Sequence, residues 1–169
     1  DWTLRAVMYP YTDPVTGNVV PADPCFDSSP LFNESPKTII CTGYPFAYSH
    51  NASDDELDEI FYAWDEPLDD FFGVYNPPAN PAPLTFLAPY SYDNPLPGGV
   101  TLDTITGEIA YNSTTSGNFV TVVRIDAYKC GQLVAQIYRE IQAVLIACPT
   151  LAGGAANTQP TITPPFIDP

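Results

Sequence analysis

The sequence has few basic residues. Its 169 residues include 5 Lys and Arg against 20 Asp and Glu, so the formal net charge is −15 at pH 7. Nucleic acids and anionic membrane surfaces are bound through clustered Lys and Arg side chains. We therefore expect no nucleic-acid partner and no membrane insertion. The charge favours either a cation ligand or a solvated acidic face that keeps the protein in solution.

Long apolar runs and catalytic motifs are also missing. No apolar run reaches the ~18 residues of a membrane-spanning helix. The sequence starts without Met or a secretion signal, which indicates a mature or excised segment. His50 is the only histidine, and no phosphate-binding or dinucleotide-binding motif is present. We expect His50 to be structural and the protein not to be an enzyme.

The four cysteines show no C-x-x-C spacing, which argues against a zinc or thioredoxin-type site. An even number of cysteines is typical of an oxidising, extracellular setting. We predict a local Cys25–Cys41 disulfide. A straight strand would place Cys130 and Cys148 ~50 Å apart, beyond the reach of a disulfide. Their pairing would need a bent or broken strand, so the second pair stays open.

Alternating and β-branched segments predict strands. The runs NFVTVVRIDAY and LVAQIYREIQAVLIAC flank Lys129–Gln132, which is typical of a hairpin. Thr106 and Gly107 indicate a second turn. Residues 54–64 are the one helical candidate, because apolar residues recur at i, i+3, i+4 and i+7 behind a capping Ser53. On periodicity alone we predict a short helix there.

Two segments resemble a known repeat. LPGGVTLDTITGEIAYNSTTSGNFVTVVRIDAY is similar to the second half of a cadherin-like or putative-Ig repeat, with its L-D-x-x-T-G-x-I motif from Leu102 to Ile109. AYSHNASDDELDEIFYAW resembles the first half. The stretches CFDSSPLFNESPKTIICTGYPFAYSHNASD and GQLVAQIYREIQAVLIAC resemble modules of large secreted surface proteins of gliding bacteria, the cargo of the type IX secretion system.

This resemblance replaces the helix with a turn over 54–58 and a strand over 60–64. It also implies a Ca²⁺ site, because carboxylates at alternate positions of a tight loop supply the oxygen ligands that Ca²⁺ prefers. The implied ligands are Asp54, Glu56 and Asp58, with Asp126 as an additional one. Leu57 departs from the pattern, since the family has a Gly there. A solvated acidic face remains the alternative.

The expected fold is all-β, with a seven-stranded Ig/cadherin-like sandwich over 38–149. Residues 1–37 are expected to form an extra N-terminal strand and linker, and residues 150–169 a Pro-rich linker or docking arm. Inward residues of alternating strands would fill the core. We expect this core to include Phe46, Tyr48, Phe61, Val120, Val122, Ile125, Ile137 and Ile141.

The expected function is that of an extracellular, cell-surface structural or adhesive module in a filament or multidomain array. We expect the first strand to have no sheet of its own. Either it is the end of a preceding domain in a longer protein, or it completes a neighbouring copy, head to tail. The residues predicted to be donated are Leu4, Ala6, Val7 and Tyr9. The alternative is a carbohydrate-binding module that holds a glycan on Tyr75, Tyr90 and Tyr92.

Overall fold

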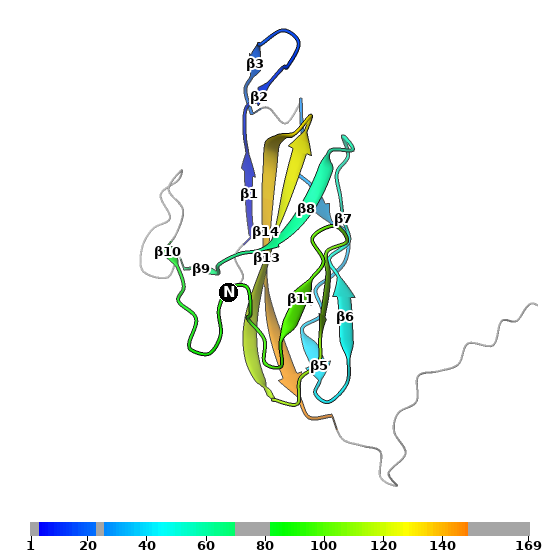
Figure 1. Cartoon of the computed structure of the whole chain (residues 1–169), viewed down its shortest axis with the longest axis vertical. Helices are drawn as coiled ribbons and strands as arrows, with labels where there is room; N and C mark the ends of the chain where they lie inside the picture. Colours follow the sequence, from blue (N-terminus) through cyan, green and yellow to red (C-terminus); the bar gives the residue numbers. More distant parts are fainter. Residues whose placement is uncertain (1–3, 23–25, 70–81, 149–169) are drawn as a thin grey trace, which may run out of the picture.

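The computed structural model describes residues 4–22, 26–69 and 82–148. Within these ranges every regular element is a strand, and no helix is long and apolar enough to cross a membrane. A five-stranded sheet, which is built on a long hairpin, and a three-stranded sheet form two layers (Figure 1). The predicted all-β class is confirmed, and the layering is consistent with a β-sandwich.

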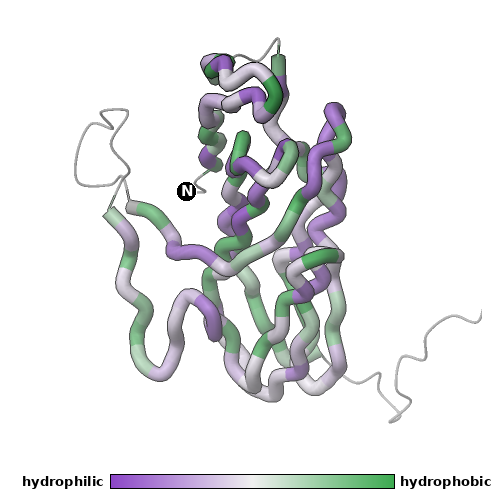
Figure 2. The backbone as a smooth tube through the Cα atoms, turned by 45° about the horizontal axis from the view of Figure 1, so that its top comes forward, coloured by the Kyte–Doolittle hydropathy of each residue, from purple (hydrophilic) through white to green (hydrophobic). Residues whose placement is uncertain are grey.

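The central hairpin consists of β13 (Gly117–Lys129) and β14 (Gln132–Ile146). Both strands are rich in β-branched residues, which pack well on a pleated surface. Hydrophobic residues recur along the backbone of the molecule and are interspersed with hydrophilic ones (Figure 2). Cys130 and Gly131 form the turn with φ of 50° and 76°, as a type I′ hairpin turn requires. The predicted hairpin is confirmed.

Three strands flank this hairpin in the larger sheet. β8 (Glu59–Trp64) pairs antiparallel with β13. β1 (Leu4–Met8) pairs antiparallel with β14. β5 (Ile39–Cys41) runs parallel to the last residues of β14. The order is therefore β1-β14-β13-β8, with β5 beside the far end of β14.

The position of β1 contradicts the predicted strand donation. Leu4 pairs with Arg139 and Met8 with Ala135, and the Tyr9 amide continues the ladder by donating to the Val134 carbonyl at 2.8 Å. The long hairpin leaves one edge of β14 open, and an open strand edge readily binds another strand. The residues predicted to join a neighbouring copy therefore complete the protein's own sheet. The predicted strand donation is wrong because β14 of the same chain offers the open edge that β1 occupies.

The second layer contains β11 (Val100–Leu102), β12 (Glu108–Tyr111) and β6 (Phe46–Ser49), in the order β11-β12-β6. It lies in front of the lower half of the hairpin (Figure 1). Side chains from both layers form one core. Its buried members are Ile40, Tyr62, Leu96, Ile109, Tyr111, Val123, Ile125, Ile137, Ala143 and Leu145.

Three short strand pairs lie outside these two sheets. They are β2 (Tyr11–Thr12) with β3 (Val19–Val20), β4 (Leu31–Phe32) with β7 (Ala52–Ser53), and β9 (Leu68–Asp69) with β10 (Ala82–Pro83). The β2–β3 pair extends beyond the tip of the long hairpin (Figure 1).

The turn between β11 and β12 is built by Asp103 and Gly107. The Asp103 carboxylate accepts hydrogen bonds from the amides of Ile105 and Thr106, each at 2.8 Å. Gly107 has a φ of 68°, and a Cβ at this position would lie 2.4 Å from the ring of Tyr62. The predicted turn is confirmed, and its glycine is required both by the backbone and by the core.

The helix predicted from periodicity over 54–64 is wrong. Residues 54–58 form a turn, and β8 follows. In the strand, Tyr62 is 4% exposed in the core, whereas the neighbouring Phe61 points the other way and is 37% exposed. Phe61 packs edge-on against Tyr128, so its predicted place in the core is also wrong. Leu57, which began the apparent apolar stripe, is 88% exposed.

Candidate functional site

The acidic loop before β8 is shaped by Asp54. One oxygen of its carboxylate, Oδ1, accepts hydrogen bonds from the amides of Glu56 and Asp58, both at 3.1 Å. The Leu57 amide donates to the Asp54 carbonyl at 3.2 Å, and Leu57 itself has a φ of 61°. A non-glycine residue in this region is strained. The loop therefore closes around Asp54 although Leu57, and not a glycine, occupies the position with positive φ.

Lys129, the last residue of β13, joins this loop to a distant segment. Its ammonium donates to Asp58 Oδ2 at 2.7 Å and to Asp27 Oδ1 at 3.1 Å, and it lies 5.6 Å from the ring centre of Phe26. The Ser28 hydroxyl donates to Glu56 Oε2 at 2.7 Å. We call Asp27, Asp54, Glu56, Asp58 and Lys129 the tip cluster.

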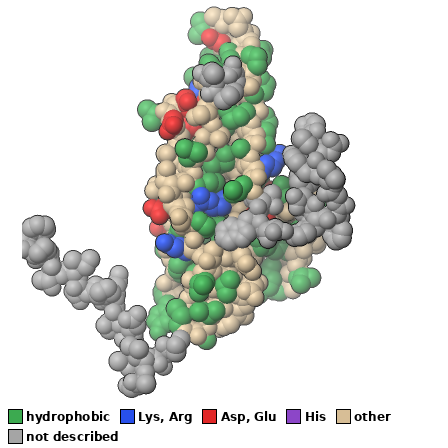
Figure 3. Space-filling model, turned by 180° about the vertical axis from the view of Figure 1, so that it is seen from behind, with side chains coloured by type: hydrophobic (Ala, Val, Ile, Leu, Met, Phe, Trp, Pro, Cys, Tyr) green, Lys and Arg blue, Asp and Glu red, His purple; other side chains and the backbone are tan. Residues whose placement is uncertain are grey.

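The tip cluster holds more negative charge than Lys129 neutralises. Burial raises the pKa of Asp27 and of Asp54, and the nearby carboxylates of Asp58 and Glu56 add to the rise. Burial also opposes the charged form of Lys129, but its hydrogen bonds with Asp58 and Asp27 outweigh this and raise its pKa. The Oδ2 atoms of Asp27 and Asp54 are buried, and neither has a hydrogen-bond partner among the residues that the structure describes. Acidic side chains also gather at one place on the rear face near this end of the molecule (Figure 3).

Asp126, the additional ligand implied by the resemblance, belongs to a different network. Arg124 donates from Nε to Asp126 Oδ1 at 2.8 Å and from a terminal nitrogen to Oδ2 at 3.0 Å. Gln136 donates to the same Oδ1 at 2.6 Å. Arg124 also pairs with Asp65 at 2.6 Å. Both oxygens of Asp126 are therefore engaged by its neighbours on the sheet.

The residues as placed do not fit a Ca²⁺ ion. Such an ion takes about six to eight oxygen ligands. Within the described ranges, no group of three or more His, Cys, Asp or Glu side chains is arranged to hold a metal. Asp54 Oδ1 is bound by the backbone, Asp58 and Asp27 face an ammonium, and Asp126 is paired with Arg124. The structure brings together only part of the implied ligand set.

The tyrosines of the alternative glycan site do not form one platform. Tyr90 lines a largely apolar groove of about 350 Å³, together with side chains such as Phe86, Leu87 and Phe119. Its ring stands edge-on to Phe119, with 5.4 Å between ring centres. Tyr92 is 46% exposed and is not among the residues that line the groove. Tyr75 lies outside the described residues.

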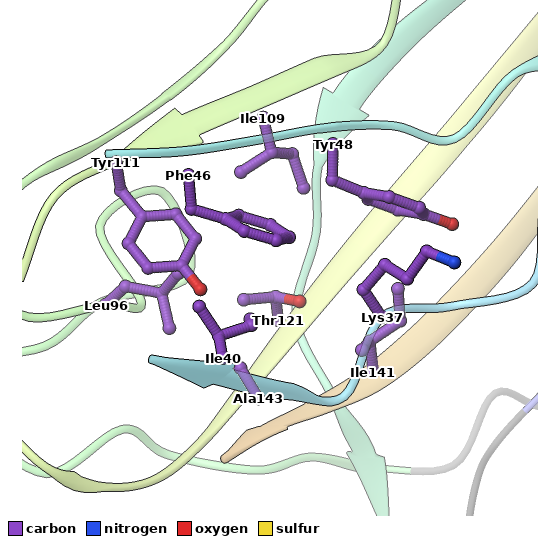
Figure 4. A pocket seen from close by; sticks show the side chains of 10 residues that line it. All are labelled: Lys37, Ile40, Phe46, Tyr48, Leu96, Ile109, Tyr111, Thr121, Ile141 and Ala143. Atoms are coloured by element: carbon purple, nitrogen blue, oxygen red, sulfur yellow. The ribbon is translucent and has the colours of Figure 1, made fainter. Parts of the chain in front are cut away.

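A small cavity lies inside the core, between the two layers (Figure 4). It measures about 20 Å³, which is room for one water molecule. The hydroxyl of Tyr111 points toward Ile40 and Thr121 at this cavity (Figure 4). It is buried, and within residues 4–22, 26–69 and 82–148 it has no hydrogen-bond partner. Burial raises the pKa of Tyr111 to about 12. The cavity can satisfy this hydroxyl with a water molecule but is too small for an organic substrate.

His50 is fully buried at 0% exposure. Its ring packs against those of Phe32 and Tyr48, with 5.7 Å and 5.1 Å between ring centres. Neither ring nitrogen has a hydrogen-bond partner in the described part of the chain. Burial, assisted by the charge of Arg139, lowers the pKa of His50 to about 3. The imidazole is therefore neutral at physiological pH and serves as part of the packing.

The disulfide joins Cys41 to Cys148, with 5.3 Å between their Cα atoms, so the predicted Cys25–Cys41 pairing is wrong. The parallel pairing of β5 with the end of β14 brings Cys41 to the point where β14 ends, a contact that local spacing does not reveal. Cys130 is exposed and carries a free thiol. Cys25 lies outside the described residues.

Sequence analysis missed Lys129 and Asp27 as partners of the acidic loop. The available signal was charge: Lys129 is one of 5 basic residues in the sequence and lies beside the hairpin turn. Asp27 offered no comparable signal, since it lies 31 positions before Asp58 in the sequence. No known family model matches the chain, and neither a curated protein nor a solved structure matches it. The functional argument therefore depends on the residues of this chain.

Proposed function

We propose that this chain is an extracellular structural module of a bacterial surface protein, which works in an array of neighbouring domains and carries tension along the chain. The observation that supports this function most directly is the Cys41–Cys148 disulfide. Disulfides persist in oxidising compartments, outside the cytosol. The resemblance to secreted surface modules agrees with this location.

The disulfide also changes the path that a pulling force takes. The two cysteines are 107 residues apart in sequence, and the covalent bond is the shortest connection between them. Tension between the two ends of the chain therefore passes from Cys41 directly to Cys148. The intervening residues, which include all of β13 and β14, lie inside a closed loop and cannot be extended while the bond is intact.

Two backbone hydrogen bonds between the segments of β5 and β14 reinforce the region around the disulfide. The Thr42 amide donates to the Ile146 carbonyl at 2.8 Å, and the Val144 amide donates to the Thr38 carbonyl at 2.6 Å. These bonds hold β5 beside β14 next to the disulfide. The point where the chain leaves the sheet after β14 is therefore held both by the disulfide and by backbone hydrogen bonds. A domain that only has to bind a ligand gains little from such a force path, whereas a domain in a tensioned array needs one.

Immunoelectron microscopy of intact source cells tests this function. Antibodies raised against the purified chain should label unpermeabilised cells and decorate extended surface material at repeated positions. Cells that lack the corresponding gene are the control. Labelling that requires permeabilisation, or that marks only single dispersed particles, would refute the array.

The groove beside Tyr90 supports a second candidate, the binding of a glycan or another ligand with an apolar face. Its volume of about 350 Å³ is within the range of small-ligand sites. Binding to a glycan array that disappears in Tyr90→Ala, but persists in Tyr44→Ala, would favour this candidate. Tyr44 is half exposed and does not line the groove, so it is a suitable control.

A further inference from the structure

The groove beside Tyr90 is walled by two parts of the chain. One wall is the segment between β10 and β11, and the other is the start of β13 around Phe119. The first wall is fixed at both of its ends, because the Leu84 amide donates to the Pro67 carbonyl at 2.7 Å and Leu96 is buried in the core at 2% exposure. The groove is therefore formed before any ligand enters it, as is usual for binding sites.

The lining of this groove is apolar and uncharged. It includes Pro67, Leu84, Phe86, Leu87, Pro95 and Phe119. Among the described residues no Asp, Glu, Lys or Arg lines it, although the whole chain carries a formal net charge of −15. Leu84 is 44% exposed and Leu87 is 84% exposed, so apolar surface remains in contact with water. An occupant of matching chemistry is apolar, uncharged and narrow enough for a volume of about 350 Å³.

The C-terminal segment of the same chain has this chemistry. Residues 149–169 lie outside the described part of the chain, and their sequence ends in PTITPPFIDP from Pro160 onward. Asp168 carries the one charged side chain of this segment. Proline fixes φ, and the residue before a proline is restricted to extended backbone, so Pro160, Pro164 and Pro165 favour a polyproline II conformation. Such segments bind grooves lined by aromatic side chains at a small cost in conformational entropy, because they are extended before they bind.

The last described residue, Cys148, lies close to the groove. Asn118, which lines the groove, pairs with Val144 of β14, and Cys148 follows Val144 by only four positions. At ~3.3 Å per residue along β14 and ~4.8 Å between neighbouring strands, Cys148 is ~15–20 Å from the groove. The segment after β10 and the end of β14 also lie in the same half of the molecule (Figure 1).

The length of chain between Cys148 and Pro160 fits this distance. For a random coil as long as residues 149–159, the root-mean-square end-to-end distance is ~18 Å. The effective concentration of a tethered ligand is highest when this length matches the distance to be spanned, and it then reaches the order of 1 mM. A contact with a dissociation constant on the order of 1 mM would therefore be occupied about half of the time.

We propose that the Pro-rich end of the chain, residues 160–167, docks into the groove beside Tyr90 of the same molecule. Pro164, Pro165 and Phe166 supply the apolar surface that covers Leu84 and Leu87. The groove is then the receptor of a segment of its own chain, and any external ligand has to compete with that segment. This inference concerns the isolated chain and does not depend on the proposed array.

Photo-crosslinking of the full chain tests the proposal. The photoreactive amino acid p-benzoyl-phenylalanine replaces Ile167, which leaves Pro164, Pro165 and Phe166 in place. After irradiation, denaturing gel electrophoresis separates monomer from cross-linked dimer, and peptide mass spectrometry locates the linked residues. We expect links within the monomer to the two walls of the groove, residues 84–95 and 118–120.

Matched variants of the labelled chain show whether the groove holds this segment. Leu87→Asp places a charge in the apolar groove and should lower the yield of these links at least ~5-fold. Leu57→Asp makes the same change at a leucine that is 88% exposed and does not line the groove, so it should leave the yield unchanged. Because both leucines are largely exposed, each variant should melt within about 3 °C of the unsubstituted chain. Phe166→Ala changes only the docking segment and should lower the yield as Leu87→Asp does.

Three results would overturn the proposal. Links found only in the dimer would mean that the segment binds a second copy. Links spread evenly over the molecule would leave the groove to an external ligand such as a glycan. A yield that neither Leu87→Asp nor Phe166→Ala lowers would show that the links do not arise from docking in the groove.

Discussion

Acidification should destabilise the protein through His50. Its imidazole is fully buried between Phe32 and Tyr48 with neither nitrogen hydrogen-bonded, and Arg139 adds a positive charge nearby. The folded protein therefore resists protonation of this ring, whereas the unfolded chain accepts the proton readily. When the unfolded state binds more protons, stability falls as the pH falls.

The size of the expected loss of stability follows from the change in the pKa of His50 on folding. The pKa of His50 falls from 6.5 to about 3 on folding, which corresponds to roughly 5 kcal/mol in full at ~1.4 kcal/mol per unit. This contribution is present above pH 6.5 and is lost progressively between pH 6.5 and 3. Between pH 7 and pH 5 the loss amounts to about 2 kcal/mol.

Urea unfolding at pH 7 and pH 5 measures this loss in the wild type and in His50→Phe, which keeps an aromatic ring and removes the titration. The comparison uses each protein's own difference between the two pH values, so that any packing change in the variant cancels. Contributions from Asp27 and Asp54, whose pKa values burial raises, are common to both proteins. They have the opposite sign, because these groups gain protons in the folded state first. If the wild type and the variant lose the same stability, the argument about His50 is wrong.

Two further predictions concern the disulfide and a turn. Cys148→Ser should lower the free energy of unfolding by about 4–5 kcal/mol, because the closed loop spans 107 residues; a change below about 1 kcal/mol in urea unfolding would contradict this. Gly107→Ala should cost about 2–4 kcal/mol, since its φ is 68° and the new Cβ would meet Tyr62. The control Gly17→Ala, with a φ of 71° and open space around it, should cost only about 1–2 kcal/mol, and equal losses would refute the role of Tyr62.

The sequence predicted the long hairpin correctly because local signals agree there. β-branched residues on both sides of Cys130 and Gly131 favour strands, and the two turn residues fit a tight hairpin. The segment over 54–64 misled periodicity analysis, since its apolar spacing fits both a helix and a strand with one side exposed. Tyr62 faces the core, whereas Leu57 lies in the turn and faces solvent. The deciding factor, pairing with β13, is a long-range contact that periodicity does not contain.

The candidate site was predicted only in part for the same reason. The acidic loop around Asp54 was recognised from its composition, but the groups that surround it come from other segments. Lys129 lies at the end of β13 in the long hairpin, and Asp27 lies in the segment between β3 and β4; both come close to the acidic loop only in the folded protein. The cysteine pairing failed similarly, since a short sequence distance favoured Cys25, whereas the parallel contact of β5 with β14 places Cys41 beside Cys148.

Single-molecule pulling on the purified chain, held at its two ends, tests the proposed role under tension most directly. With the disulfide intact, the residues between Cys41 and Cys148 should not extend at any force below bond rupture. After reduction, the same molecule should extend by an additional length of roughly 370 Å, at ~3.5 Å for each of the 107 residues in the loop. Equal extensions in the oxidised and reduced states would contradict the account, because the disulfide would then not carry the force.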